Sequence, residues 1–232
     1  MSLNRYIVTL EEKKLLAREV WKLTFSRPLD FVYQPGQFCQ FFIENDGVEV
    51  ARFYSFASTP TEDSLQFIVK FVPAGLGSRY FAGLNIGDKA KIGPAMGKFT
   101  VPAEFAGLTM IATGVGLAPF TGFIKENLKF KNISNKLRLL FGARSEADLF
   151  WQDELKDFAA KYPNFSFITT LSQPTDGIAW HGQEGRVTAH LAPFINAEDH
   201  FFVCGSPAMI TDVRKILVES KIEPKKIHLE AF

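Results

Sequence analysis

The hydrophobic pattern of this 232-residue chain changes at Pro102, and the change limits the folds that the chain can adopt. Before Pro102, short stretches rich in β-branched and aromatic residues are separated by turn signals such as Gln34-Pro35-Gly36. Six short strands in close succession are typical of a small antiparallel barrel. We expect these strands at 6–10, 20–26, 37–43, 51–57, 65–71 and 89–92, with a short helix at 78–83.

After Pro102, apolar strands alternate with helices. Strands are predicted at 108–113, 137–141, 165–170, 200–204 and 227–231, and helices at 118–130, 148–161, 187–194 and 208–220. This alternation is typical of a parallel, doubly wound sheet. The predicted fold class is therefore β plus α/β, with a six-stranded antiparallel barrel over residues 1–102 and a five-stranded parallel sheet over 103–232.

Composition argues against several classes of function. The net charge of +1 gives no electrostatic basis for binding nucleic acid. The sequence lacks a signal pattern and any run of the ~20 apolar residues of a membrane helix, so we expect a cytoplasmic protein without a membrane partner. Because Cys39 and Cys204 lie far apart and the four histidines are scattered, we expect neither a metal site nor an iron–sulfur centre.

The segment 52–58, Arg-Phe-Tyr-Ser-Phe-Ala-Ser, has the pattern of a strand that contacts a nucleotide. In an extended strand Arg52 and Tyr54 share one face, and Phe53 and Ser55 share the other. An arginine can bind a pyrophosphate with two parallel hydrogen bonds, and a tyrosine can cover an aromatic ring system. A flavin nucleotide offers both groups. An edge strand with one exposed arginine is the alternative, and this segment alone does not decide between them.

Two glycine-rich turns each precede a predicted helix. Residues 114–119, Gly-Val-Gly-Leu-Ala-Pro, follow the first apolar strand of the second half, and 75–78, Gly-Leu-Gly-Ser, lie in the first half. Glycine backbone at a helix N-terminus favours a bound phosphate. An ordinary tight turn at 114–119, and simple helix capping by Ser78, are the alternatives.

Two further segments fall at the carboxyl edge of the predicted parallel sheet, where open α/β folds bind ligands. Residues 204–209, Cys-Gly-Ser-Pro-Ala-Met, follow the fourth strand, and Glu230-Ala231-Phe232 ends the fifth. A cysteine at the end of an apolar strand is most often a small buried residue. The glycine, serine and proline that follow Cys204 favour a turn that faces a ligand.

In this order, and over almost the whole chain, the motifs resemble those of the ferredoxin–NADP reductase family. That family pairs an FAD-binding antiparallel barrel with a nucleotide-binding α/β domain. The residues that match its motifs are Arg52, Tyr54, Ser55 and Ser58 (R-x-Y-S-x-x-S), Gly75 and Ser78 (G-x-x-S), Gly114, Gly116 and Pro119 (G-x-G-x-x-P), Cys204, Gly205 and Met209 (C-G-x-x-x-M), and Glu230 and Phe232 (the C-terminus).

The resemblance implies a role for each matching residue. Arg52 would contact the FAD pyrophosphate, Tyr54 would stack on the isoalloxazine ring, and Ser55 would lie near the flavin N5 atom, which accepts the hydride. Further FAD contacts are implied for Phe53, Ile68, Val69, Gly75, Gly77, Ser78 and Thr113.

The second half would bind the hydride donor. Cys204 would lie near C4 of the nicotinamide, Glu230 would serve the associated proton transfer, and Phe232 would cover the flavin and move for hydride transfer. Further nicotinamide-nucleotide contacts are implied for Gly114, Gly116, Pro119, Ser172, Gly205 and Met209.

The choice between NADPH and NADH depends on cations around the 2′-phosphate. Bacterial ferredoxin reductases, which this chain resembles around 141–151, place three arginines there. Arg144 and Arg186 match two of them, whereas the third position, after Ser172, holds Gln173. We favour NADPH because two of the cations are kept, and NADH stays open.

The electron acceptor is expected to be ferredoxin or flavodoxin, which are acidic and would dock on a basic face. The candidate docking residues are Lys13, Lys14, Arg18, Lys221, Lys225 and Lys226. The alternatives are the reductase component of an oxygenase with its iron–sulfur centre on a partner, a reductase of free flavin, and a non-catalytic regulatory subunit.

Overall fold

The computed structural model describes residues 5–131 and 133–231, which form two compact units. Residues 5–101 together with Ala118–Phe130 make the first unit, and Pro102–Leu117 with the described residues from Lys131 onward make the second. The helix that follows Leu117 thus packs with the first unit, although it lies within the sequence of the second. None of the described helices is long and apolar enough to cross a membrane.

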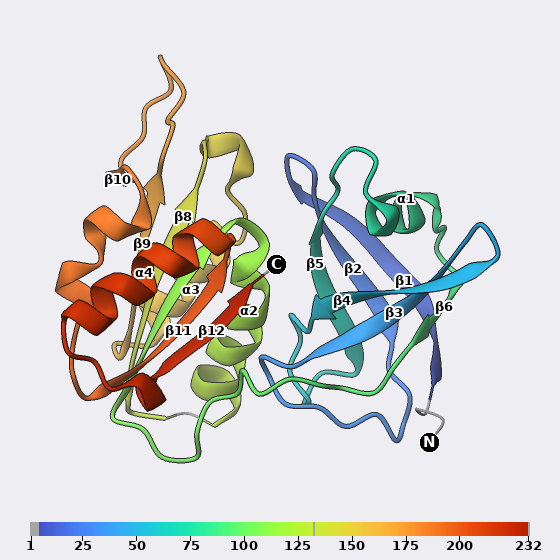
Figure 1. Cartoon of the computed structure of the whole chain (residues 1–232), viewed down its shortest axis with the longest axis horizontal. Coiled ribbons are helices and arrows are strands. Elements are labelled where there is room, and N and C mark those ends of the chain that lie inside the picture. The colour runs from blue at the N-terminus through green and yellow to red at the C-terminus, as the bar shows by residue number, and fades with distance from the viewer. Residues whose placement is uncertain (1–4, 132, 232) are drawn as a thin grey trace. The chain divides into compact units, whose positions relative to one another are not determined.

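The described part of the first unit contains a six-stranded antiparallel sheet, as predicted (Figure 1). Its strands run in the order β4-β3-β6-β1-β2-β5. The sheet curls so that Phe56, just after β4, pairs with Phe67 of β5, and the Ala57 N–H donates to the Gln66 carbonyl over 2.7 Å. The strands are β1 Tyr6–Ala17, β2 Val20–Ser26, β3 Phe38–Asn45, β4 Val48–Ser55, β5 Ser64–Lys70 and β6 Lys89–Ile92.

Phenylalanine rings fill the core of this barrel, which explains much of the high Phe content of the chain. The Phe41 ring packs edge-on against Phe67 and Phe81 at centroid distances of 5.0 Å. Phe81 belongs to α1 (Leu76–Gly83), which closes one end of the core. Edge-to-face packing of this kind adds stability beyond the burial of apolar area.

The helix after Leu117 packs against the barrel through α2 (Ala118–Ile124) and a π-helical turn (Lys125–Phe130). The Thr121 hydroxyl donates to the Ala57 carbonyl over 2.8 Å, and Phe123 stacks on Phe99 at 5.8 Å. The predicted helix at 118–130 is therefore correct, although its second half is π-helical.

The second unit contains a parallel sheet in the order β10-β9-β8-β7-β11-β12. The described chain has six strands here rather than the predicted five. The additional strand, β10, is short and polar and lies at the edge, so it has no hydrophobic signature. The strands are β7 Gly107–Thr113, β8 Lys136–Ala143, β9 Phe165–Leu171, β10 Gln183–Glu184, β11 Asp199–Gly205 and β12 Ile227–Ala231.

Helices cover both faces of this sheet. α4 (Pro207–Glu219) packs on the face that carries Ile111 and Val203, and lies in front of the sheet in Figure 1. α3 (Gln152–Lys161) covers the opposite face, where its Gln152 accepts a hydrogen bond from Thr169 over 3.0 Å. The expected helix at 187–194 is instead two 3-10 turns, Val187–His190 and Ala192–Phe194, because Pro193 has no N–H for a continuous helix.

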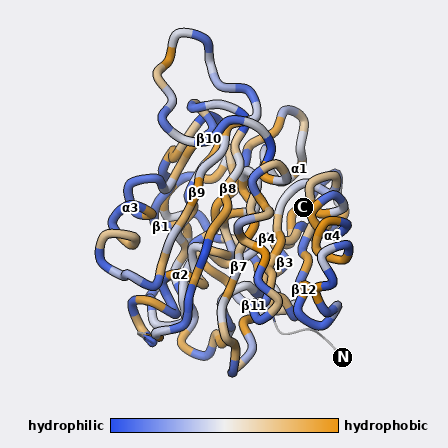
Figure 2. The backbone as a smooth tube through the Cα atoms, turned by 90° about the vertical axis from the view of Figure 1, so that its left-hand side faces the viewer, coloured by the Kyte–Doolittle hydropathy of each residue, from blue (hydrophilic) through white to orange (hydrophobic). Residues whose placement is uncertain are grey.

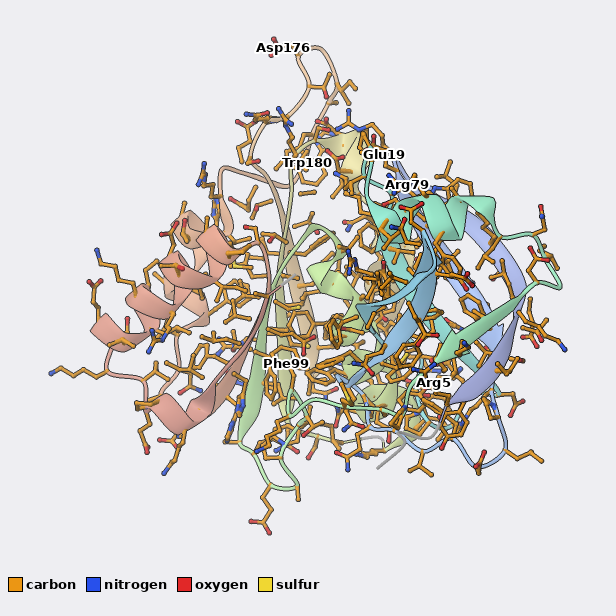
Figure 3. The ribbon with its side chains drawn as sticks, turned by 45° about the vertical axis from the view of Figure 1, so that its right-hand side comes forward. Arg5, Glu19, Arg79, Phe99, Asp176 and Trp180 are labelled. Carbon is orange, nitrogen blue, oxygen red and sulfur yellow. The ribbon has the colours of Figure 1, made fainter. Side chains whose placement is uncertain are left out.

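The segment between β9 and β10 projects beyond the carboxyl edge of the sheet (Figure 1). Figure 2 shows it in pale and blue colours with one orange stretch, and Figure 3 places Asp176 at its tip. The Trp180 Nε1–H donates to the Gln183 carbonyl over 3.0 Å, so the indole is held against the start of β10.

The strand order reverses between β7 and β11, which are neighbours although β8, β9 and β10 come between them in sequence. In open α/β sheets the crevice at such a switch point, outside the carboxyl ends of the strands, is where ligands bind. The turns that follow Thr113 and Cys204 meet at this point.

Candidate functional site

One candidate site lies on β4 of the first unit, where Arg52 and Tyr54 meet the glycine turn that begins α1. Gly77 has no space for a side chain: a Cβ atom there would overlap the Tyr54 hydroxyl and lie 4.0 Å from Cγ of Arg52. Two motifs that are separated in sequence are therefore in contact in the fold. The expected shared face of Arg52 and Tyr54 agrees with this geometry.

The Tyr54 ring is held in place on its inner side. It packs edge-on against Phe41 at 5.6 Å and against Phe81 at 5.0 Å. Burial raises the pKa of Tyr54 to about 12, so the phenol stays neutral at physiological pH. A ring that is rigid and only partly buried can present its remaining surface to a planar ligand.

Arg52 is exposed beside this ring. Its Nη1 donates to the Ala51 carbonyl over 2.9 Å, and no carboxylate in the described part of the chain pairs with it. Most of the five donors of the guanidinium are thus available to an anion.

The N-terminus of α1 offers further donors. Gly75 precedes the helix, and none of the described side chains caps its first turn. The Ser78 hydroxyl instead accepts a hydrogen bond from the Val72 N–H over 2.8 Å and braces the preceding loop. Capping by Ser78 was therefore the wrong alternative, because α1 begins two residues before it. Backbone N–H groups in the first turn of a helix favour an anion, so the turn fits a phosphate group.

The other residues predicted to contact the flavin do not share the exposed face of Arg52 and Tyr54. The side chain of Phe53 lies on the face of β4 opposite to Tyr54, half exposed, and packs edge-on against Phe38 at 5.6 Å. Ser55 is buried at the end of β4, and the Val69 side chain belongs to the barrel core. Ile68, its neighbour in β5, is also buried. Contacts of these residues with FAD stay predictions.

Ser58, the last residue of the first motif, has a structural role. Its hydroxyl lies 2.8 Å from the Tyr33 hydroxyl and accepts from the Gln66 N–H over 3.0 Å. These bonds join the end of the motif to β5, where the barrel closes.

A second candidate site lies at the switch point of the parallel sheet. A Cβ on Gly116 would overlap the Cys204 carbonyl oxygen and lie 2.8 Å from Cα of Gly205. Gly114 has a φ of +54°, and no described atom lies within 4 Å of where its Cβ would be. The two glycines therefore differ: Gly116 allows the turn to pack on β11, whereas Gly114 presents open backbone to a ligand.

Cys204 is buried at the end of β11, with Ala112 of β7 and Glu230 of β12 as its cross-strand neighbours. Burial, together with the nearby Glu230 carboxylate, raises the pKa of the thiol well above its usual value. The thiol is therefore protonated at physiological pH. The register confirms that Cys204 and Glu230 lie together, and their catalytic roles stay predictions.

The turn after Cys204 is held by Thr113 and Met209. Gly205 adopts a φ of +150°, and a Cβ there would overlap the Thr113 hydroxyl and approach Cε of Met209 at 2.9 Å. The Ser206 N–H donates to Thr113 Oγ1 over 3.3 Å, and Ser206 caps α4 by accepting from the Met209 N–H over 3.3 Å. Thr113, Gly205 and Met209 thus lie together at this turn. All three are expected to contact the nicotinamide nucleotide or the flavin.

Two further predicted site residues are Pro119 and Phe232. Pro119 is buried in the first turn of α2, where proline is tolerated. Phe232 lies outside the described residues.

The predicted phosphate-selecting residues follow β8, β9 and β10. The Arg144 Nε–H donates to Oε1 of Gln173 over 2.7 Å, and the Gln173 N–H donates to the Arg144 carbonyl over 2.8 Å. The Ser172 N–H donates to the Ala143 carbonyl over 3.1 Å. The sequence pattern showed only that Gln173 is not an arginine. Its role as the partner that orients Arg144 needed the register of β8 and β9.

Arg186 follows β10, which pairs in parallel with the end of β9. The Gly185 N–H donates to the Leu171 carbonyl over 2.8 Å, so Arg186 begins beside the Ser172–Gln173 turn. Its side chain is exposed, and none of the described side chains pairs with it.

Lys13, Lys225 and Lys226, which are among the proposed docking cations, are bound within the chain. Lys225 pairs with Glu223 at 2.8 Å, and Lys226 donates to the Ala197 carbonyl over 2.7 Å. Lys13 is turned inward and donates to carbonyl groups of α1. Among the described residues no group of three or more His, Cys, Asp or Glu side chains could hold a metal ion.

Comparison with known proteins agrees with this geometry. Residues 7–101 match the oxidoreductase FAD-binding domain, and residues 110–215 match the oxidoreductase NAD-binding domain. Ferredoxin–NADP reductase B of Sorangium cellulosum is 30% identical over 226 residues, which cover 92% of this chain and 91% of that protein. The chain belongs to the ferredoxin–NADP reductase family.

Other members of the family are similar over part of their length. The toluate 1,2-dioxygenase electron transfer component of Pseudomonas putida is 29% identical over 203 residues, 86% of this chain and 59% of that protein. The anthranilate 1,2-dioxygenase electron transfer component of Acinetobacter baylyi is 30% identical over 210 residues, 89% of this chain and 59% of that protein. The chain thus spans less than two thirds of these longer relatives.

Solved structures share the fold. The ferredoxin–NADP+ reductase of Plasmodium falciparum superposes with a TM-score of 0.83 at 23% identity, covering 99% of this chain and 97% of that one. The FAD/NAD-binding domain of nitric oxide dioxygenase from Vibrio cholerae superposes with a TM-score of 0.86 at 22% identity, covering 97% and 98%.

Proposed function

We propose that this member of the ferredoxin–NADP reductase family is an FAD-dependent reductase that takes a hydride from NADPH and passes electrons to ferredoxin or flavodoxin in the cytoplasm. The observation that carries the proposal is the contact between Gly77, Tyr54 and Arg52. It brings a helix N-terminus, a neutral aromatic ring and an available guanidinium to one place.

The first unit has the groups that FAD requires. Arg52 and the first turn of α1 would bind the pyrophosphate, because both direct N–H donors at an anion. Tyr54 would lie on the isoalloxazine ring. Bound FAD would supply the step that protein side chains cannot, since it accepts two electrons as a hydride and releases them singly.

The second unit would bind the nicotinamide coenzyme at its switch point. The open backbone at Gly114 would approach the coenzyme pyrophosphate, and Thr113 and Met209 would hold the turn after Cys204 in place. The uncharged Cys204 thiol would pack at the nicotinamide. The carboxylate of Glu230 would exchange the associated proton with solvent, and the covering role of Phe232 stays part of the proposal.

Replacing Cys204 with alanine is expected to slow flavin reduction about tenfold and to leave FAD binding unchanged. The alanine removes the side chain that would position the nicotinamide, and residue 204 belongs to the second unit rather than to the one proposed to bind FAD. Stopped-flow bleaching of the bound flavin by NADPH measures the rate. Cys204→Ser, which keeps the size of the side chain, is the matched variant, and reduction of Cys204→Ala at the wild-type rate would contradict this role.

NADPH is proposed over NADH because the partner of Arg144 is the uncharged side chain of Gln173, which orients the guanidinium and leaves its charge uncompensated. Gln173 accepts from its Nε–H and leaves the two terminal nitrogens free to bind a 2′-phosphate. Arg186 supplies a second cation near the same turn. The P. falciparum reductase, whose fold is shared, has been solved with 2′P-AMP, the 2′-phosphorylated half of such a coenzyme.

Arg186→Ala is expected to raise the KM for NADPH about tenfold, because a charge-assisted phosphate contact contributes about 1.5 kcal/mol or more. The KM for NADH should change less than about twofold. Steady-state reduction of an artificial acceptor measures both values, and Arg214→Ala, which removes an exposed cation on α4, is the control. Equal losses for the two coenzymes would place Arg186 away from the 2′-phosphate.

The acceptor is tested by measuring reduction of ferredoxin, flavodoxin and free FMN with each coenzyme. The proposal predicts rapid turnover with ferredoxin or flavodoxin. The second candidate function, reductase component of an oxygenase, is favoured by the similarity to the toluate dioxygenase component. It predicts turnover with a separate iron–sulfur protein or terminal oxygenase instead. Turnover with free FMN alone would indicate a flavin reductase, and no turnover would indicate a regulatory subunit.

A further inference from the structure

The side chain of Lys13 occupies an unusual position for a lysine on a barrel strand. Its Nζ donates to the carbonyl oxygens of Phe81 and Ala82 over 2.8 Å each, and to that of Leu84 over 3.4 Å. These carbonyls belong to the C-terminal end of α1. Lys13 therefore binds the end of α1 opposite to the turn that is proposed to hold the FAD pyrophosphate.

A β-bulge directs Lys13 to this position. Strand β1 pairs Leu10 with Phe25 and then Lys13 with Leu23, with an irregularity in register between Leu10 and Glu12. Directly paired residues share a face, so Lys13 lies on the interior side together with the buried Leu23. Uninterrupted alternation from Leu10 would turn Lys13 outward. A bulge of this kind moves the side chains that follow it to the opposite face of the strand.

The ammonium group satisfies a specific need of α1. The last carbonyl groups of a helix lack partners within it and carry its negative partial charge. The last turn of α1 contains no basic residue of its own. Lys13 supplies the cation from β1, and burial lowers the pKa of its ammonium group.

We propose that Lys13 is a positioning residue for the flavin phosphates, a proposal that rests on the FAD site proposed above. An α-helix of eight residues is about 12 Å long and moves as one body. When Lys13 holds the C-terminal end of α1 on β1, it also fixes the position along the helix axis at which Gly77, near the other end, contacts Tyr54. Without this anchor, the first turn of α1 would no longer be held where the pyrophosphate meets Arg52.

The test compares FAD with riboflavin, which has the same ring system without phosphates. Apo-protein of the full chain is titrated with each flavin and binding is followed by flavin fluorescence. For Lys13→Met we expect the Kd of FAD to rise at least about tenfold, and that of riboflavin to stay within about twofold. Lys13→Arg, which keeps the charge, should retain most of the FAD affinity. Lys14→Met, at the adjacent exposed lysine, should match the wild type.

The outcomes separate this proposal from the one on which it rests. If the wild type binds riboflavin as tightly as FAD, the phosphate site at α1 is wrong, and with it the role of Lys13. If the wild type binds FAD more tightly than riboflavin, and Lys13→Met keeps the same ratio of the two Kd values with an unchanged FAD affinity, only the role of Lys13 is wrong. Equal weakening of both flavins would show a merely structural role. Should Lys13→Met fail to fold, Lys13→Gln, which keeps an N–H donor, provides the same comparison.

Discussion

Replacing Gly77 with alanine is expected to weaken FAD binding at least about a hundredfold, equivalent to about 2.7 kcal/mol. The new methyl group would overlap the Tyr54 hydroxyl, so either the ring or the first turn of α1 must move. Both are proposed to contact FAD, and a displacement of either removes contacts to the ring or to the pyrophosphate. Titration of the apo-protein with FAD, followed by flavin fluorescence, measures the loss.

Gly83→Ala is the matched control for this change, because it adds the same methyl group to the same helix. No described atom lies within 4 Å of a Cβ at Gly83. Alanine in a helix is more stable than glycine by up to about 1 kcal/mol, so α1 should be retained and FAD affinity unchanged. Wild-type FAD affinity in Gly77→Ala would show that the contact with Tyr54 does not shape the flavin site.

Gly116→Ala is expected to lower the free energy of unfolding by about 2–3 kcal/mol. Its methyl group would overlap the backbone carbonyl of Cys204, which cannot rotate away as a side chain can. The displaced strand end carries Cys204 and Gly205, so affinity for NADPH should fall as well. Denaturant unfolding measures the stability, and equilibrium titration measures coenzyme binding.

Gly114→Ala separates the two glycines of this turn. Its methyl group has free space, so the cost is only that of a positive φ, about 1 kcal/mol. We expect a small loss of stability together with a large loss of NADPH affinity, because the added methyl group would stand where the coenzyme pyrophosphate approaches. Equal stability losses at Gly114 and Gly116 would contradict the different roles assigned to them.

The division into a barrel and a parallel sheet could be predicted because each has a strong periodic signal. Strands β2 and β12 occupy the predicted residues, and in both of them apolar and polar residues largely alternate. Strand β10 could not be predicted, because two polar residues at a sheet edge bury nothing. The domain boundary after residue 102 stays a prediction, and Ala118–Phe130 shows that packing need not follow chain order.

The sequence predicts which motifs form the candidate site, but it does not predict how their residues are arranged in space. The glycine motifs indicate close approach of backbone, but only the structure distinguishes packing on β11 by Gly116 from open backbone at Gly114. The first strand is predicted to end at residue 10, whereas β1 continues to Ala17, and the bulge before Lys13 has no clear sequence signal. By its charge alone, Lys13 falls among the candidate docking cations. Such bulges depend on one unpaired residue and are invisible to periodicity.

The most direct test of the proposed function is anaerobic reduction of the purified, FAD-loaded protein by nicotinamide coenzymes. Absorbance of the bound flavin is followed after mixing with equal concentrations of NADPH or NADH. We predict rapid bleaching by NADPH and slower bleaching by NADH. A flavin that stays oxidised with both coenzymes would contradict the assignment of this chain as a reductase.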